Sequence, residues 1–77
     1  MRIKEFLGAA VLDKNAVEVG EINDLEFDPE EGAFDKIVIS LKSGIFSKET
    51  VEVSYENIAA IGDYVLLDIE LPKKADD

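Results

Sequence analysis

The chain has 77 residues, 18 of them acidic and 8 basic, and it contains neither cysteine nor histidine. This length allows one domain with a small core, and the missing residue types exclude disulfides, Ser–His or Cys–His catalysis and cysteine-based zinc sites. The formal net charge of −10 opposes direct binding to a nucleic-acid backbone or to an anionic membrane surface.

No apolar run approaches the roughly 20 residues that a membrane-spanning helix needs. Residues 1–7 include a glutamate and lack the long apolar core of a signal peptide. We therefore expect a soluble, cytoplasmic domain without direct membrane insertion. Oligomerisation is a common way for so small a domain to gain stability.

The N-terminal residues predict a short lead-in and a first strand. Ile3, Phe6 and Leu7 have helix-like spacing, and the following Gly8 would end a helix. The apolar run 10–12 predicts a strand. In the turn that follows, Asp and Asn side chains can bond to their own backbone.

Residues 17–27 predict a long strand whose apolar residues are spaced for one buried face. Their alternation changes phase near Gly20 and again at Asn23 and Asp24. A change of phase turns later side chains to the other face unless a β-bulge absorbs it. We therefore expect bulges at these two places, and a bent strand of the kind found in small barrels.

The C-terminal half predicts three further strands, over residues 34–41, 51–55 and 64–71, the first reached through a Pro- and Gly-containing turn. Their inward-facing residues are Ile37, Ile39, Leu41, Val51, Val53, Tyr55, Val65, Leu67, Ile69 and Leu71. Residues 55–61 predict a single helical turn that buries Ile58 and Ile61 in the end of the barrel.

These elements indicate an all-β fold, a small closed or nearly closed barrel of five or six antiparallel strands with one short helical turn. We expect the domain to span residues 1–72. Pro72 ends the last strand because proline cannot donate to a ladder. Residues 73–77 are expected to form a disordered C-terminal tail.

Several short motifs, in this order, resemble the PRC-barrel domain family over about residues 7–71. They are Val19-Gly20-Glu21, Phe27-Asp28, the strand 34–41, Val53-Ser54-Tyr55-Glu56-Asn57-Ile58, and Ile61-Gly62-Asp63 before the last strand. Ser54 stands where the family often has proline. The resemblance implies a PRC-type β-barrel in which Gly20, Glu21, Asp28, Gly62 and Asp63 are motif or structural positions.

The resemblance also implies a function, because PRC-barrels serve as adaptors. The family occurs in the photosynthetic reaction-centre H subunit, in the C-terminal half of RimM and in stand-alone archaeal proteins of about this length. Some stand-alone forms resemble cell-division protein B, which associates with SepF. We therefore expect a non-catalytic adaptor without a cofactor, acting in archaeal cell division with SepF. The alternative is a ribosome-maturation or RNA-processing accessory, similar to the C-terminal domain of RimM and acting through a protein partner.

An acidic run spans the long strand, the turn and the start of the next strand. It comprises Glu21, Asp24, Glu26, Asp28, Glu30, Glu31 and Asp35. Oxygen ligands of this type suit Ca²⁺ or Mg²⁺, but the spacing of an EF-hand loop is absent. We expect a solvated face or an acidic docking patch rather than a metal site, and keep a small metal- or ligand-binding domain as a third hypothesis.

Catalysis is not expected. The pairs Asp63–Asp68 and Glu52–Glu56 are the available candidates for catalytic carboxylates, but a barrel this small is filled by its own side chains. Asp63 is instead expected to accept backbone N–H bonds in the turn after Gly62.

Five apolar residues fall outside the predicted core. Val38, Tyr64 and Leu66 lie on predicted outer faces, and Ile45 and Phe46 lie in a loop. A contiguous exposed apolar patch often marks an interface. We therefore expect these five residues to form a protein-binding surface, through which the chain forms a homodimer.

Overall fold

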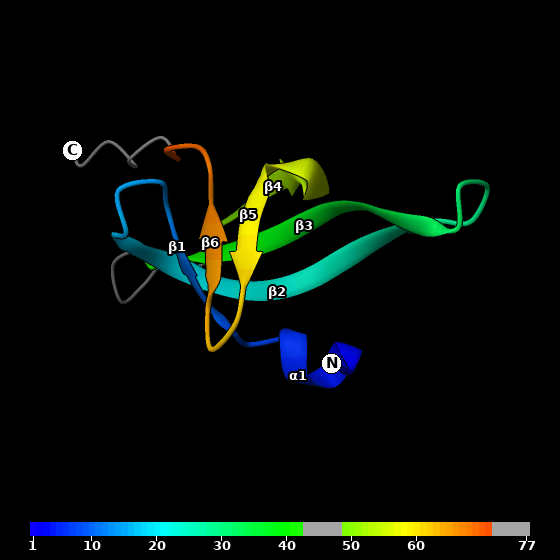
Figure 1. Cartoon of the computed structure of the whole chain (residues 1–77), viewed down its shortest axis with the longest axis horizontal. Helices are drawn as coiled ribbons and strands as arrows, with labels where there is room; N and C mark the ends of the chain where they lie inside the picture. The colour runs from blue at the N-terminus through cyan, green and yellow to red at the C-terminus, as the bar shows by residue number, and fades with distance from the viewer. Residues whose placement is uncertain (43–48, 72–77) are drawn as a thin grey trace.

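The computed structural model describes residues 1–42 and 49–71. The elements are α1 (Ile3–Phe6), β1 (Ala10–Leu12), β2 (Glu18–Asp28), β3 (Ala33–Leu41), β4 (Thr50–Ser54), the 3-10 turn η1 (Tyr55–Asn57), β5 (Ile58–Ile61) and β6 (Val65–Leu67). The six strands form one sheet in the order β4-β3-β2-β1-β6-β5 (Figure 1). The predicted all-β class with a short helical turn is confirmed. None of the described helices has the length and apolarity to cross a membrane.

The strand pairing differs in one respect from the predicted antiparallel arrangement. The pair β1–β6 is parallel, whereas the other neighbouring strands are antiparallel. The chain leaves β4 through η1, forms β5 and turns back into β6, which then lies beside β1. The three-residue η1 connects β4 at one edge of the sheet directly to β5 at the other edge, so the two edges lie near each other.

The core follows the alternation that the sequence predicts for the C-terminal strands. Its buried apolar residues are Phe6, Val11, Ile22, Ile37, Ile39, Val53, Val65, Leu67 and Leu71. Partly buried side chains that include Leu41, Val51, Tyr55 and Ile69 pack against them. The inward face of each C-terminal strand is therefore as predicted.

The long strand β2 is irregular, as its changes of apolar phase predict. Against β3 the register skips Asn23, which confirms the second predicted bulge. A second shift lies against β1 and skips Val19, one residue before the predicted Gly20. A third, which the sequence did not indicate, lies between Glu26 and Phe27 and skips Asp35 of β3. Gly20 is needed for a different reason, because a β-carbon there would overlap the backbone carbonyl oxygen of Ser40 on β3.

The segment after β4 differs from its prediction. The helical turn ends at Asn57, and Ile58–Ile61 form the strand β5, which reverses at Gly62 to pair with β6. Ile58 packs against the core, but Ile61 is 38% exposed. The prediction that Ile61 is buried in the barrel end is therefore wrong.

The last predicted strand is shorter than expected, since β6 ends at Leu67. Beyond it, the Asp68 N–H donates to the carbonyl of Asn57, and the Lys14 N–H donates to the carbonyl of Ile69. Residues 68–71 are thus bonded to the chain near Asn57 and Lys14 but add no further residue to strand β6. The side chain of Leu71 is nevertheless buried in the core. The tail after Leu71 lies outside the described residues.

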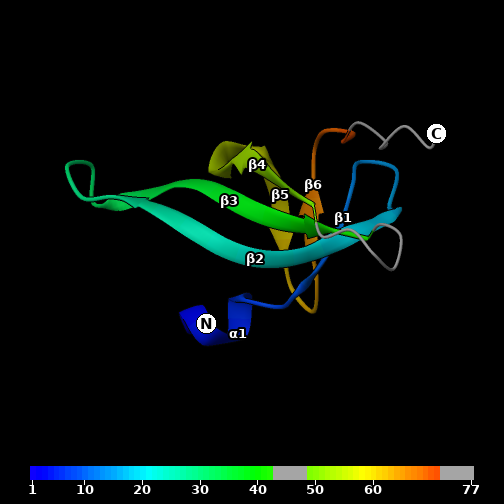
Figure 2. The ribbon, with the colours of Figure 1, turned by 180° about the vertical axis from the view of Figure 1, so that it is seen from behind.

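The β2–β3 hairpin projects from the rest of the molecule, and α1 lies beside β2 near the base of the projection (Figures 1 and 2). The register explains this shape. β4 pairs only with residues 36–40 of β3, and β1 pairs only with residues 18–21 of β2. The far end of the hairpin is therefore a two-stranded ribbon without a third strand.

Candidate functional site

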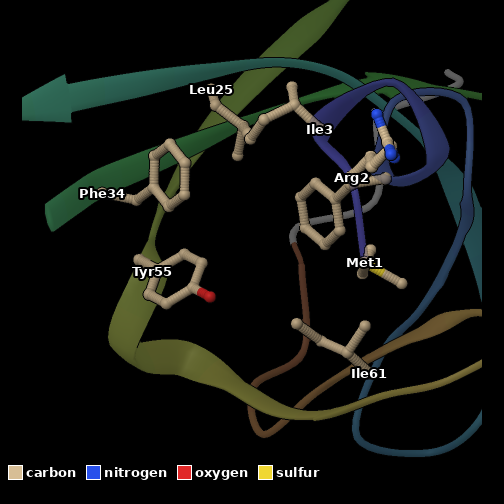
Figure 3. A pocket seen from close by; sticks show the side chains of 8 residues that line it. Met1, Arg2, Ile3, Leu25, Phe34, Tyr55 and Ile61 are labelled. Atoms are coloured by element: carbon tan, nitrogen blue, oxygen red, sulfur yellow. The ribbon is translucent and has the colours of Figure 1, made fainter.

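A groove of about 390 Å³ opens between α1, the β2–β3 hairpin, η1 and β5 (Figure 3). Its lining residues are Met1, Arg2, Ile3, Phe6, Leu25, Phe34, Tyr55 and Ile61. Most of these side chains are apolar, and the volume is in the range of ligand and peptide-anchor sites. The groove is the candidate functional site.

The wall on the α1 side depends on a short helix that is fixed by local contacts. The Arg2 backbone N–H donates to the Glu5 carboxylate at 2.9 Å, which satisfies a group at the start of α1. Phe6 is buried and anchors the helix to the core. Gly8 has φ +89°, a conformation that glycine adopts without strain, and it turns the chain from α1 toward β1. Ile3 lines the groove and is 47% exposed.

The opposite wall is a row of aromatic rings. The ring centroids of Phe27 and Phe34 lie 5.8 Å apart at 72°, and those of Phe34 and Tyr55 also lie 5.8 Å apart. Phe27 is 57% exposed, because it lies on the projecting part of the hairpin. The expectation that the apolar residues of β2 share one buried face is therefore wrong at Phe27, and an apolar surface continues from the groove along the hairpin.

The groove also offers a polar group. The hydroxyl of Tyr55 points toward the side of the groove where Ile61 and Met1 lie (Figure 3). It makes no hydrogen bond to the residues that the structure describes. A bound molecule with a carbonyl or amide group can therefore pair with it.

The β2–β3 hairpin carries mostly negative charge, whereas the charged residue that lines the groove is Arg2. The acidic run is exposed except for Asp28, which is partly buried and whose carboxylate accepts from the N–H groups of Glu30 and Glu31 in the hairpin turn. The Nζ atom of Lys36 forms an ion pair with Oε1 of Glu52, at 3.7 Å. Within residues 1–42 and 49–71, no three potential ligand side chains are close enough together to hold a metal ion.

The predicted interface residues do not form one patch in the described part of the chain. Val38 lies between Asp24 and Glu52 across three strands, and it is half-buried. Leu66 and Tyr64 belong to β6 and the turn before it, and β2 and β1 separate β6 from β3. Ile45 and Phe46 lie outside the described residues.

The register gives Leu66 neighbours that the sequence did not indicate. Leu12 of β1 and Ala60 of β5 are its direct partners on the same face of the sheet. Leu12 is half-buried and Ala60 is exposed. Tyr64, before β6, is 51% exposed. These residues form a second apolar surface, apart from the groove.

The predicted motif positions have mostly structural roles. Gly20 is buried against β3, Glu21 is exposed, and the N–H of Gly62 donates to the carbonyl of Tyr64. Asp63 is exposed, and its carboxylate accepts no hydrogen bond from the described residues, contrary to the prediction.

Two of the weighed catalytic carboxylates also have local partners. Asp68 accepts from the Asn57 side chain at 3.1 Å, and Glu52 pairs with Lys36. Both side chains thus take part in structural contacts on the surface.

Sequence reasoning missed the groove itself, because its walls come from five elements that meet only in the fold. The available signal was the pair of phenylalanines that flank the hairpin turn, Phe27 and Phe34. Large apolar residues so near a turn favour either a core or an interface.

Residues 1–70 match the family model of the PRC-barrel domain. None of the curated proteins matches the sequence. Among solved structures, the fold is similar to that of a protein from Pseudomonas aeruginosa described as the 16S ribosomal RNA processing protein RimM, with a TM-score of 0.67 and 19% identity. The match covers 91% of the present chain and 44% of that protein. The likeness supports the fold, and the chain spans less than half of that protein's length.

Proposed function

The chain belongs to the PRC-barrel domain family, and from this membership we propose that it is a non-catalytic adaptor that binds another protein. The observation that carries the proposal is the apolar groove with its continuation over the exposed Phe27. Apolar surface that extends beyond single residues on a small domain commonly marks an interaction site. The described carboxylates and hydroxyls show no nucleophile–base pair of the kind that catalysis needs.

Within this role, the finer proposal is an adaptor of archaeal cell division whose partner is SepF. It is supported by the chain's resemblance to the PRC-barrels of that type. The test is a titration of the purified chain with purified SepF from the same organism, followed by calorimetry. Saturable binding is expected, and no heat of binding at high micromolar concentrations would contradict the SepF assignment.

A homodimer is part of the same proposal, through the surface that includes Tyr64 and Leu66. Tyr64 is exposed, and Leu66 lies next to Leu12. Light scattering should give the mass of a dimer, and Tyr64→Glu should shift it toward the monomer, because a buried unpaired charge destabilises an interface. A monomeric mass for the unmodified chain would overturn this part.

The second candidate function is an accessory in ribosome maturation. It is favoured by the similarity of the fold to the Pseudomonas aeruginosa protein described as a ribosomal RNA processing protein. The negative charge of the present chain requires that such a role act through a protein rather than through RNA. Calorimetry with purified ribosomal proteins in place of SepF separates the two candidates, since binding to only one class is expected.

A further inference from the structure

The projecting hairpin has two chemically different faces. The register pairs Leu25 with Ile37 and Phe27 with Phe34, so these side chains share the face toward the groove. The pairs Glu26–Lys36 and Asp24–Val38 share the other face. A two-stranded ribbon has no layer of its own to cover an apolar face. Ile37 is buried in the core, beneath the part of β3 that pairs with β4. The part of the apolar face that is available to a bound chain is therefore the outer part, at Phe27 and Phe34.

The size of the groove limits what can occupy it. A volume of about 390 Å³ holds a few side chains rather than the surface of a whole domain. Leu25, Phe34 and Ile61 provide apolar walls, and the free hydroxyl of Tyr55 can bond to a peptide group. These features fit one segment of polypeptide with a large apolar anchor.

The charge around the hairpin turn determines the chemistry of the occupant's other residues. Glu30 and Glu31 in the turn and Asp35 at the start of β3 are exposed. Lys36, the basic residue nearest to them along the chain, already pairs with Glu52. Lysine or arginine side chains on a bound segment would therefore find carboxylates at this end that form no ion pair with a described residue.

The opposite end of the groove differs in charge. Arg2 and Lys4 belong to the α1 side, and neither forms an ion pair with a described residue. A segment whose basic residues lie toward the hairpin turn avoids repulsion by these two cations. The difference in charge between the two ends of the groove thus also fixes the direction of the bound segment.

We propose that the groove binds a short segment of the partner protein that has an aromatic or large aliphatic anchor and, toward the hairpin turn, lysine or arginine residues. This inference rests on the proposed adaptor function and specifies its partner site. A second copy of the chain is a poorer occupant, because its own hairpin would bring a second set of carboxylates to the same place.

The test is selection of binders from a displayed library of random peptides about twelve residues long, against the immobilised full-length chain. Enriched peptides are expected to carry an apolar anchor with basic residues on one side, and to bind less tightly as NaCl is raised. Phe27→Ser should weaken the selected peptides about tenfold or more. Its control, Val17→Ser, removes a similarly exposed side chain outside the groove and should leave binding unchanged.

Charge reversal provides the second arm. Glu31→Lys should weaken binding about threefold or more, whereas Glu21→Lys makes the same charge change away from the hairpin turn and should have little effect. Both residues are exposed, so folding is not expected to change.

Three results would overturn the inference. Enrichment of acidic peptides, or of peptides insensitive to Phe27→Ser and Glu31→Lys, would remove the hairpin from the site and with it the proposed anchor and basic residues, while the adaptor function stands. A library without any specific binder would overturn the peptide-segment proposal, and the calorimetry with purified partners would then decide the adaptor function separately. Amide shifts at the groove that change with protein concentration alone would identify a second copy as the occupant.

Discussion

The ring of Phe27 packs edge-on against the ring of Phe34, with centroids 5.8 Å apart and an interplanar angle of 72°. Phe34 in turn contacts Tyr55 of η1. The exposed ring of Phe27 is thus held by neighbours that reach back to the barrel. A surface that is ordered before binding loses less entropy when a partner docks.

Phe27→Ser should change the free energy of unfolding by about 1 kcal/mol or less, because more than half of the side chain is already in solvent. Urea denaturation, with Ile39→Ala as a core reference, measures this. Ile39 is fully buried, and its truncation should cost about 2–5 kcal/mol. A loss for Phe27→Ser as large as that of Ile39→Ala would show that Phe27 supports the fold rather than a binding surface.

Gly20→Ala should destabilise the domain by about 1–3 kcal/mol. The added β-carbon would overlap the Ser40 carbonyl, which belongs to the backbone of β3 and cannot rotate away. Gly62→Ala is the matched control, since a β-carbon there meets no atom within 4 Å. Chemical denaturation of both variants gives the comparison, and equal stabilities would contradict the close approach of β2 and β3.

Asp13→Ala should cost about 1–3 kcal/mol. The buried carboxylate of Asp13 accepts from the N–H groups of Asn15 at 2.8 Å and Val17 at 3.0 Å, and both donors would lose their partner. Asp13→Asn keeps one carbonyl oxygen and should recover most of the loss. Thermal melts of the two variants measure the difference. An Asn variant as unstable as the Ala variant would show that the negative charge, rather than the acceptor, holds the turn.

Millimolar Ca²⁺ or Mg²⁺ should leave the melting temperature unchanged relative to NaCl at the same ionic strength. A cation that binds the native state specifically must raise its stability. The described carboxylates do not converge on a common point. A rise in melting temperature that saturates with Ca²⁺ and is absent with NaCl would revive the metal-binding hypothesis.

Hydrophobic alternation predicts the inward faces of the C-terminal strands because each inward residue there meets the core directly. Ile37, Ile39, Val65 and Leu67 are all essentially inaccessible to solvent. The same rule fails at Phe27, since alternation identifies a face of the strand and does not tell whether other strands cover it. At Phe27 the hairpin extends beyond the residues that pair with β1 and β4.

The groove could not be predicted, because its walls depend on how α1 docks against β2 and on where the turn after β4 ends. Ile61 reaches the groove because residues 58–61 form a strand instead of continuing the helical turn. Of the predicted interface residues, Val38, Tyr64 and Leu66 were chosen by phase, and phase does not show that β2 and β1 separate β3 from β6.

Backbone amide shifts of the isotope-labelled chain, titrated with a peptide selected from the library or with the purified partner, test the central claim most directly. The account predicts saturable shifts in α1, at Leu25 to Phe34 of the hairpin, and at Tyr55 and Ile61. Shifts confined to the outer surface around Leu66 and Tyr64, with the groove unchanged, would contradict it.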